Sequence, residues 1–206
     1  MAVLALVLLA VWLLLVAGLP TLLRLRRTGD ASVPRFRDRP GSPQWWARLL
    51  SGVGFACAVA APVAEVAGLD PIPLLDRTPV RAAGAVLAVL GIAATLAAQL
   101  AMGSSWRPDV DPDTRTVLVT TGPFRLVRNP IFTATAATAA GLALLVPNLL
   151  AAAMLVAFLA ALELQVRLVE EPYLHRVHGN AYAKYAARTG RFLPRIGRHR
   201  PDTWSA

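Results

Sequence analysis

Two short segments hold most of the polar side chains that could bind a ligand in this otherwise apolar chain. Residues 122–130 read GPFRLVRNP, and residues 167–194 contain the adjacent carboxylates Glu170 and Glu171. A turn would need only the Gly, the Pro and the Asn of the first segment. The two arginines in this segment therefore need a different explanation. Two neighbouring carboxylates near a helix C-terminus repel each other and oppose the helix dipole. Because charged residues at the edge of a bilayer are functional candidates, we interpret both segments as parts of one site.

The charges around Glu170 have helical spacing. Glu163 and Arg167 are four residues apart, and Arg167 precedes Glu170 and Glu171 by three and four residues. On a continuous α-helix such residues share one face. We therefore expect these four side chains to lie side by side where a transmembrane helix leaves the membrane.

Metal binding is not predicted. Three alternating aspartates, Asp109, Asp111 and Asp113, have the spacing that opens an EF-hand loop, but threonine occupies the sixth and twelfth positions where Gly and Glu are required. His175 and His178 are three residues apart without another good ligand beside them, which favours surface histidines over a zinc site. The single cysteine excludes a disulfide framework.

Apolar runs define the elements that must position these residues. The chain has 206 residues, 56% of them hydrophobic, which is too apolar for an ordinary soluble domain. Runs at 2–23, 49–66 and 82–102 are long enough for transmembrane helices, which need about 20 residues. The run at 131–166 is too long for one span and contains Pro147-Asn148, a turn and N-cap signal. We predict an all-α polytopic bundle of about five transmembrane helices, with a helical hairpin over residues 131–168 whose second arm continues as helix past Arg167.

The arginines predict the orientation. Seven basic residues lie between 24 and 48, four between 107 and 128, and eight from 167 to the C-terminus, whereas the other two connections contain only Arg77 and Arg81. Basic residues collect on the cytoplasmic side. Five spans with the N-terminus outside and the C-terminus in the cytoplasm place all three basic segments inside. Topology and anionic lipids therefore account for the net charge of +9, and a nucleic-acid partner is not expected.

The two polar segments together resemble the membrane methyltransferases of the isoprenylcysteine carboxyl methyltransferase and phospholipid methyltransferase group. The shared pattern is Gly-Pro-aromatic, Arg-(His or Asn)-Pro-x-aromatic, a helical hairpin, Arg-x-x-Glu-Glu, a Gly, spaced Tyr residues and Leu-Pro. The matching residues here are Gly122-Pro123-Phe124, Arg128-Asn129-Pro130-Ile131-Phe132, Arg167, Glu170-Glu171, Gly179, Tyr182, Tyr185 and Leu193-Pro194. The match covers roughly residues 100–195.

The resemblance implies S-adenosyl-L-methionine as a methyl donor, bound in a cytosolic pocket without a metal. It implies that Glu170 and Glu171 help to hold the donor and that Arg167 faces the acceptor, so Arg167 and Glu171 are the predicted catalytic residues. The remaining residues implied to line the cofactor pocket are Leu118, Val119, Gly122, Phe124, Arg128, Asn129 and Phe132. The chain departs from the family pattern in having Asn129 in place of the usual His, and Phe124 and Phe132 in place of Tyr. Asn can still hydrogen-bond an adenine edge or a ribose, but it cannot shuttle a proton.

The function implied is S-adenosylmethionine-dependent methylation of a lipophilic acceptor that enters from the bilayer, with isoprenylcysteine-like carboxyl methylation as the first interpretation. Methylation of phospholipid amines or other lipophilic small molecules stays open. An NADPH-dependent membrane reductase on a similar scaffold and a non-enzymatic transporter are further alternatives; transporters, however, place their polar groups near the midplane. We expect one domain, in which residues 1–100 are variable transmembrane helices and residues 101–195 form the cofactor-binding catalytic core.

Overall fold

Helices account for the regular structure of the described chain. The computed structural model describes residues 1–28, 39–102 and 117–199. The three aspartates at 109–113 lie outside the described residues. The elements are α1 (Ala2–Trp12), the π-helix η1 (Leu13–Gly18), α2 (Leu19–Thr28), α3 (Pro43–Val66), α4 (Thr78–Met102), the 3₁₀-helix η3 (Gly122–Arg125), α5 (Pro130–Leu145), α6 (Leu149–Gln165), the π-helix η4 (Val166–Glu170), α7 (Glu171–His178) and α8 (Asn180–Arg188).

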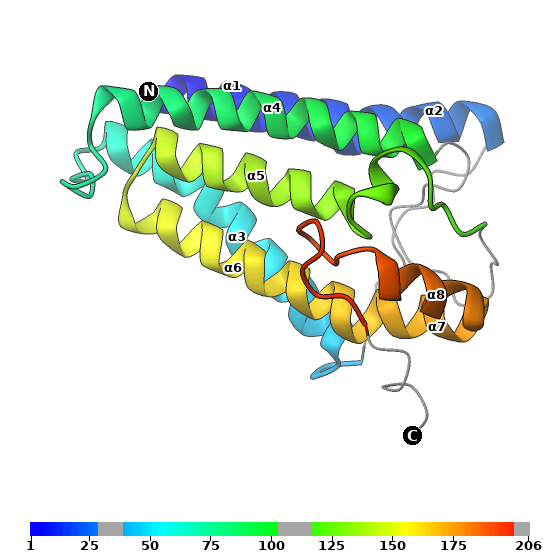
Figure 1. The fold of residues 1–206 in the computed structure, drawn as a ribbon. Helices are drawn as coiled ribbons and strands as arrows, with labels where there is room; N and C mark the ends of the chain where they lie inside the picture. The colour runs from blue at the N-terminus through cyan, green and yellow to red at the C-terminus, as the bar shows by residue number, and fades with distance from the viewer. Residues whose placement is uncertain (29–38, 103–116, 200–206) are drawn as a thin grey trace.

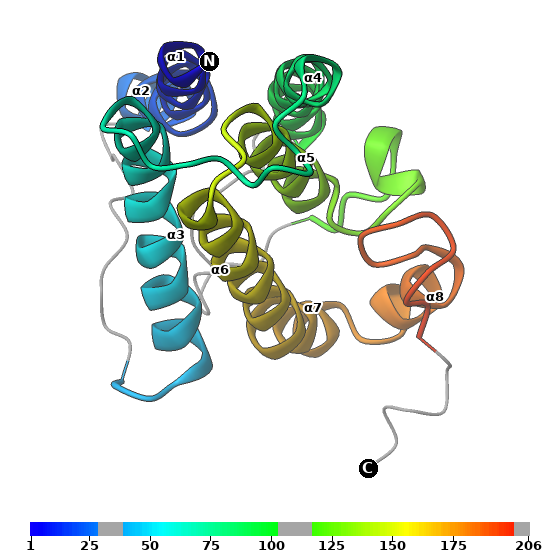
Figure 2. The same ribbon diagram turned by 90° about the vertical axis from the view of Figure 1, so that its left-hand side faces the viewer.

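The long helices run roughly side by side, and the two short helices α7 and α8 lie together at one end (Figure 1), which we call the α8 end. Viewed along the bundle, α5 lies between α4 and α6, and α3 packs beside α6 (Figure 2). Within the described chain, four helical segments are long and apolar enough to cross a bilayer: Ala2–Leu22, Pro43–Val66, Thr78–Met102 and Leu149–His178. The fifth predicted span, α5, is also apolar but has only 16 residues, about 24 Å of helix.

The predicted hairpin is present, and its turn is built by Asn148. The Asn148 side chain caps α6 by accepting from Ala151 N at 3.0 Å, and its Nδ2 donates to Ala61 O of α3 at 2.8 Å. At the same end, Arg81 Nη1 donates to Glu65 Oε1 at 2.6 Å and to Leu145 O at 3.2 Å, which supplies a partner for a carbonyl at the end of α5. The turn is therefore tied to α3 and α4. The second arm continues as helix through η4 into α7, as predicted.

Glycines allow α4 and α5 to pack backbone against backbone. A Cβ added at Gly84 would lie 2.7 Å from both Gly141 O and Leu145 N, and one added at Gly141 would lie 2.7 Å from Gly84 O. Small residues permit this close approach between membrane helices, where lipid removes the usual hydrophobic drive for association. The close contact fixes the position of α5, and with it the position of the Arg128-Asn129 segment at its N-terminus.

The substitution Gly84→Ala tests this contact. We expect a loss of about 1–3 kcal/mol in stability, the usual cost of overpacking a tight interface, measured as a lowered midpoint of thermal unfolding in detergent. The matched control is Gly52→Ala in α3, where an added Cβ meets nothing within 4 Å. The control is expected to be neutral or stabilising by up to about 1 kcal/mol. Equal midpoints for the two variants would contradict the contact.

Candidate functional site

The segment GPFRLVRNP lies against the C-terminal segment 189–199 at the α8 end. Arg128 N donates to Gly190 O at 2.8 Å, and Asn129 N donates to Arg191 O at 3.1 Å. Asn129 Nδ2 also donates to Arg191 O at 3.2 Å, and Thr133 Oγ1 donates to Phe192 O at 2.8 Å. A short parallel pairing thus connects parts of the chain that are about sixty residues apart.

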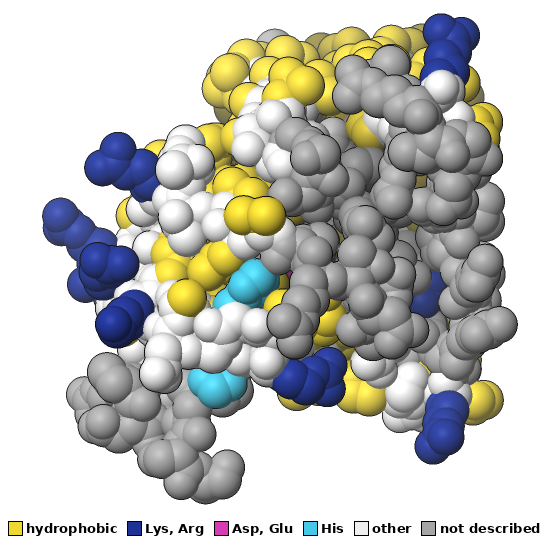
Figure 3. All heavy atoms as spheres, turned by 90° about the vertical axis from the view of Figure 1, so that its right-hand side faces the viewer, with side chains coloured by type: hydrophobic (Ala, Val, Ile, Leu, Met, Phe, Trp, Pro, Cys, Tyr) yellow, Lys and Arg dark blue, Asp and Glu magenta, His cyan; other side chains and the backbone are white. Residues whose placement is uncertain are grey.

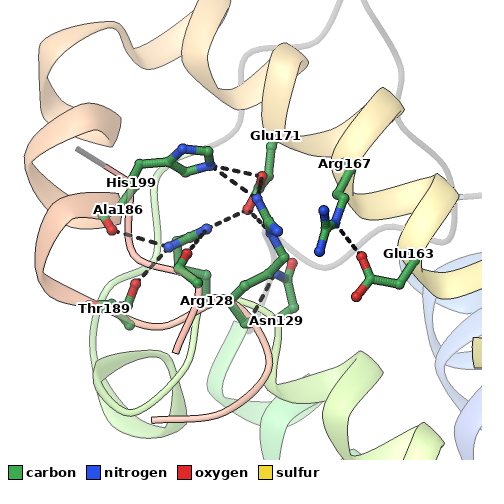
Figure 4. A network of polar contacts seen from close by, with 10 residues as sticks. Arg128, Asn129, Glu163, Arg167, Glu171, Ala186, Thr189 and His199 are labelled. Atoms are coloured by element: carbon green, nitrogen blue, oxygen red, sulfur yellow. Dashed lines mark hydrogen bonds and ion pairs between the residues drawn. The ribbon is translucent and has the colours of Figure 1, made fainter. Parts of the chain in front are cut away.

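Arg128 is the centre of the site. Its guanidinium is buried and donates from Nη1 to Ala186 O at 3.1 Å and Thr189 O at 2.6 Å (Figure 4). From Nη2 it donates to Glu171 Oε1 at 2.6 Å and to Gly197 O at 3.1 Å. Its Nε is buried without a hydrogen-bond partner in the described chain. One N–H of this buried cation is therefore left without an acceptor in the described part of the chain.

A single buried carboxylate faces two guanidinium groups. Glu171, whose side chain is only 3% exposed, accepts from Arg191 Nε at 2.9 Å and from Arg191 Nη2 at 2.7 Å in addition to the bond from Arg128. His199 Nε2 lies 3.1 Å from Glu171 Oε2. The hydrogen bond to Glu171 raises the pKa of Arg191. We call Arg128, Glu171, Arg191 and His199 the arginine–glutamate cluster.

The charges of this cluster do not balance internally. Arg128 and Arg191 contribute two positive charges against the one negative charge of Glu171. Buried charges are costly unless they are paired. The cluster is therefore suited to receive an anionic group, such as a carboxylate.

The π-helix η4 changes which residues share a face. Gln165 Nε2 lies 3.5 Å from Glu170 Oε1, a contact five residues along the chain that fits π-helical spacing. Arg167 forms an ion pair with Glu163, and these side chains are 56% and 44% exposed. Figure 4 shows them to one side of the cluster that contains Glu171. The expectation that all four charges share one face was wrong for Glu171, because the extra residue of a π-turn rotates everything that follows by about 100°.

Several other predicted site residues surround α8. Leu118 packs against the buried core formed by Tyr182, Tyr185 and Ala186. Phe124 is buried, and its carbonyl accepts a hydrogen bond from Tyr185 Oη at 2.6 Å. Burial raises the pKa of Tyr185 to about 12, although Arg128 acts in the opposite direction. Burial likewise raises the pKa of Tyr182. These phenols are therefore neutral hydrogen-bonding groups at physiological pH.

Three further predicted residues lie nearby. Gly122 begins η3 with a φ of 57°, a conformation that favours Gly. Val119 and Phe132 are half-buried, on either side of the GPFRLVRNP segment in the chain. The structure thus brings Leu118, Phe124, Arg128, Asn129 and Glu171 together, while Arg167 lies on the exposed side.

Sequence reasoning missed Arg191 and His199. Neither belongs to a residue pattern that predicts ligand binding, and both reach Glu171 only because the C-terminal segment folds back. The chain turns tightly at Gly190, where an added Cβ would overlap Leu193 O and lie 2.7 Å from Ile196 O. That tight turn directs Arg191 toward Glu171.

Two comparisons bear on the identity of the chain. Residues 80–181 match the family model described as phospholipid methyltransferase. The fold is similar to a solved structure of the eukaryotic intramembrane Ras methyltransferase, isoprenylcysteine carboxyl methyltransferase, with a TM-score of 0.59 and 21% sequence identity. That alignment covers 90% of this chain and 66% of the other, so this chain spans just under two thirds of that protein. A comparison with curated proteins gave no match.

Arg191→Ala tests the cluster. The substitution removes two hydrogen bonds from Glu171 but leaves it paired with Arg128. We therefore expect a loss of about 1.5–3 kcal/mol, the scale of hydrogen bonds to a charged group, seen as a lower unfolding midpoint in detergent. The matched control is Arg188→Ala, because Arg188 is an exposed α8 arginine whose Nε donates to Lys184 O at 3.2 Å within its own helix. We expect the control to change stability by less than about 1 kcal/mol. A midpoint for Arg191→Ala equal to that of the control would show that Glu171 does not depend on Arg191.

Proposed function

We propose that this chain, a member of the phospholipid methyltransferase and isoprenylcysteine carboxyl methyltransferase group of integral membrane proteins, transfers a methyl group from S-adenosylmethionine to a lipophilic acceptor. The family match supports methyl transfer. The observation that carries the choice of cofactor is the buried arginine–glutamate cluster with its unpaired Arg128 Nε.

The residues at the α8 end fit S-adenosylmethionine. The ligand has a carboxylate, and the cluster has an excess positive charge and an N–H donor without a partner. We assign the carboxylate to Arg128 and adenine or ribose contacts to Asn129. The lining assigned to Leu118, Val119, Gly122, Phe124 and Phe132 is apolar or backbone, which suits an adenosine group. When bound, S-adenosylmethionine supplies an electrophilic methyl group on a positively charged sulfur.

Glu171 is proposed to act through the arginines. Both of its oxygens already accept hydrogen bonds: Oε1 from Arg128 and Arg191, and Oε2 from Arg191. Its contribution to cofactor binding is therefore to hold the guanidinium groups in place. Glu170, the residue that precedes Glu171, is half-buried, and we assign it to the ammonium group of the donor. These residues are proposed to align the donor with the acceptor. Correct placement of the two in a water-poor pocket supplies most of the rate of a methyl transfer.

Arg167 is proposed to steer the head of the acceptor. It is exposed at the α8 end of the second hairpin arm, and its ion pair with Glu163 is solvent-accessible. An exposed ion pair is weak, at about 0–1 kcal/mol, so an anionic head can replace Glu163 at little cost. This favours carboxyl methylation of an isoprenylcysteine-like molecule, with phospholipid amines as the alternative substrates.

We propose that the α8 end faces the cytoplasm. Figure 3 shows Lys and Arg side chains around this end of the molecule. The outward surface of the bundle instead carries exposed apolar residues, among them Val3, Leu90 and Val156. Basic residues at one end and apolar residues along the sides are what the positive-inside rule requires.

The substitution Arg167→Ala distinguishes an effect on the acceptor from an effect on binding of the methyl donor. Titration calorimetry of the purified protein is expected to show binding of S-adenosylmethionine and S-adenosylhomocysteine but not of NADPH. Arg167→Ala should keep that affinity, while the transfer of labelled methyl groups to an organic extract of membranes falls about tenfold, a transition-state loss of about 1.4 kcal/mol.

The matched control for Arg167 is Arg125→Ala, an exposed arginine in η3 at the same end. Its turnover should stay at the level of the unmodified protein. NADPH binding without S-adenosylmethionine binding would favour a reductase, and binding of neither would refute the proposed function. If Arg167→Ala and Arg125→Ala reduce turnover equally, the effect comes from the loss of positive charge at this end of the molecule. The proposed contact between Arg167 and the acceptor would then be refuted.

The orientation predicts a labelling pattern. In a Cys57→Ser background, Asp70→Cys lies in the exposed connection between α3 and α4, and Lys184→Cys is exposed on α8. In intact cells, an impermeant thiol reagent should label the first variant and not the second. Labelling of the second variant alone would reverse the proposed orientation.

A further inference from the structure

Residues 192–197 of the C-terminal segment form a tight loop, which we call the 192–197 loop. Arg191 N donates to Ile196 O at 2.8 Å, and Ile196 N donates to Leu193 O at 3.1 Å. At the end of the loop, Gly197 O accepts from the buried guanidinium of the arginine–glutamate cluster at 3.1 Å. These bonds fix the backbone of the loop, and they fix the direction of its side chains with it.

The 192–197 loop lies beside the start of α5 and beside α8 (Figure 1). Phe192 O accepts from Thr133 Oγ1 in the first turn of α5 at 2.8 Å. Helix α5 has 16 residues, which is about 24 Å of helix, whereas the hydrocarbon core of a bilayer is about 30 Å thick. A helix this short brings its ends to the edge of the hydrocarbon core. The loop at its start is therefore expected at the boundary between hydrocarbon and lipid headgroups.

The apolar side chains of this loop point outward. Leu193 is 53% exposed and Ile196 is 63% exposed, and Pro194 between them is also exposed. Leu126, in the segment that pairs with this part of the chain, is a further exposed apolar residue. Figure 3 shows hydrophobic side chains close to Lys and Arg side chains at the α8 end. Exposed apolar groups at a bilayer boundary are favourable when they enter the lipid.

The same surface carries positive charge without a carboxylate to balance it. Arg195 and Arg198 are exposed, and the chain has no Asp or Glu between residues 172 and 199. Glu171, which precedes that stretch, is already bound by two arginines of the cluster. An Arg at a bilayer boundary can keep its charge among the headgroups while its methylene groups lie along apolar surface. Exposed apolar and basic residues together are complementary to anionic lipid.

Arg195 adopts a backbone conformation that usually requires Gly. Its φ is 68°, and it is the only non-Gly residue with a positive φ among the described residues. Such a conformation lowers stability for a residue that has a Cβ. Strain of this kind persists where the surrounding structure enforces it, and it is concentrated at sites that bind ligands. A Gly would fit the backbone of Arg195 better, but it would remove the exposed charge.

We propose that the 192–197 loop is a docking surface for anionic phospholipid. Leu193 and Ile196 enter the edge of the hydrocarbon layer, and the guanidinium groups of Arg195 and Arg198 contact the negatively charged headgroups. This inference goes beyond the proposed function, because it requires neither the methyl donor nor the acceptor. A soluble acidic partner fits this surface less well, since at this depth the apolar side chains face lipid.

The loop also connects the bilayer surface to the arginine–glutamate cluster. Arg191, directly before the loop, binds Glu171 at 2.7 Å and 2.9 Å, and Gly197 at its end binds Arg128. A lipid that holds the loop in place therefore favours these contacts. Because a ligand that binds only the folded protein stabilises it, the protein is expected to unfold at a higher temperature in anionic lipid than in zwitterionic lipid.

Quenching by brominated lipid tests the contact directly. In a Cys57→Ser background, Leu193→Cys carries a fluorescent label, and the full-length protein is placed in nanodiscs of phosphatidylcholine and phosphatidylglycerol. One of the two lipids is brominated at a time, and the dependence of quenching on composition gives their relative binding constant at this position. Phosphatidylglycerol should bind about five- to thirtyfold more strongly, the range for one to two basic residues at a membrane surface.

Three substitutions separate the charge of Arg195 from its backbone strain. Arg195→Gly relieves the strain, so it should be at least as stable in phosphatidylcholine, but it should lower the preference for phosphatidylglycerol about fivefold. It should also reduce the rise in unfolding midpoint caused by phosphatidylglycerol. Arg195→Lys keeps the charge and should retain the preference. The matched control Arg188→Gln removes an exposed charge from α8 and should retain it as well.

The outcomes that overturn the proposal are distinct. If neither brominated lipid quenches the label at Leu193→Cys, the loop lies outside the bilayer and the docking surface is refuted. Equal quenching by the two lipids would refute the preference for anionic lipid. An equal loss of preference in Arg195→Gly and Arg188→Gln would show a general effect of charge and refute the assignment to the loop. None of these measurements uses S-adenosylmethionine, so failure here leaves the proposed function untouched, and failure of methyl transfer leaves this surface untouched.

Discussion

Glu171 has two guanidinium partners in a place where its side chain is almost inaccessible to solvent. Neither arginine can be buried at low cost without that carboxylate, and the carboxylate cannot be buried without them. Arg128 comes from the segment before α5, Glu171 from the start of α7, and Arg191 from the C-terminal segment. One electrostatic requirement therefore joins three parts of the chain. The hydrogen bonds from Arg128 to the carbonyls of Ala186, Thr189 and Gly197 extend the same dependence to the end of α8.

The transmembrane helices meet this requirement by placing α5 at a fixed position. Gly84 and Gly141 let the backbones of α4 and α5 come close together, and Asn148 fixes the turn to α6. Because α5 is short, its N-terminus brings Arg128 to the same level of the bundle as η4 on the second arm. The π-turn then directs Glu171 inward and leaves Arg167 on the exposed side. The separation between the buried group proposed for the donor and the exposed group proposed for the acceptor therefore follows from one additional residue in a helical turn.

The helices were predictable from the sequence because their causes are local. Long apolar runs, the Pro147-Asn148 turn and a second arm continuing beyond Arg167 follow from hydropathy and capping. The grouping of Arg128 with Glu171 was anticipated, because the hairpin returns the chain to the same membrane face. The π-turn was not predictable, since residues 166–170 have no composition that distinguishes π from α spacing. The contacts of Arg191 and His199 were missed because they depend on pairing between residues 128–129 and 190–191, which no local pattern records.

Helix α5 connects the proposed cofactor site to the packing of the bundle. Its N-terminus directly follows Arg128 and Asn129, the two residues assigned to the cofactor. Its backbone is held close to that of α4 at Gly84 and Gly141. A shift of α5 would therefore move Arg128 relative to Glu171 on the second hairpin arm. The backbone contact with α4 thus bears on the proposed chemistry as well as on stability, because it sets the distance across which the buried ion pair must form.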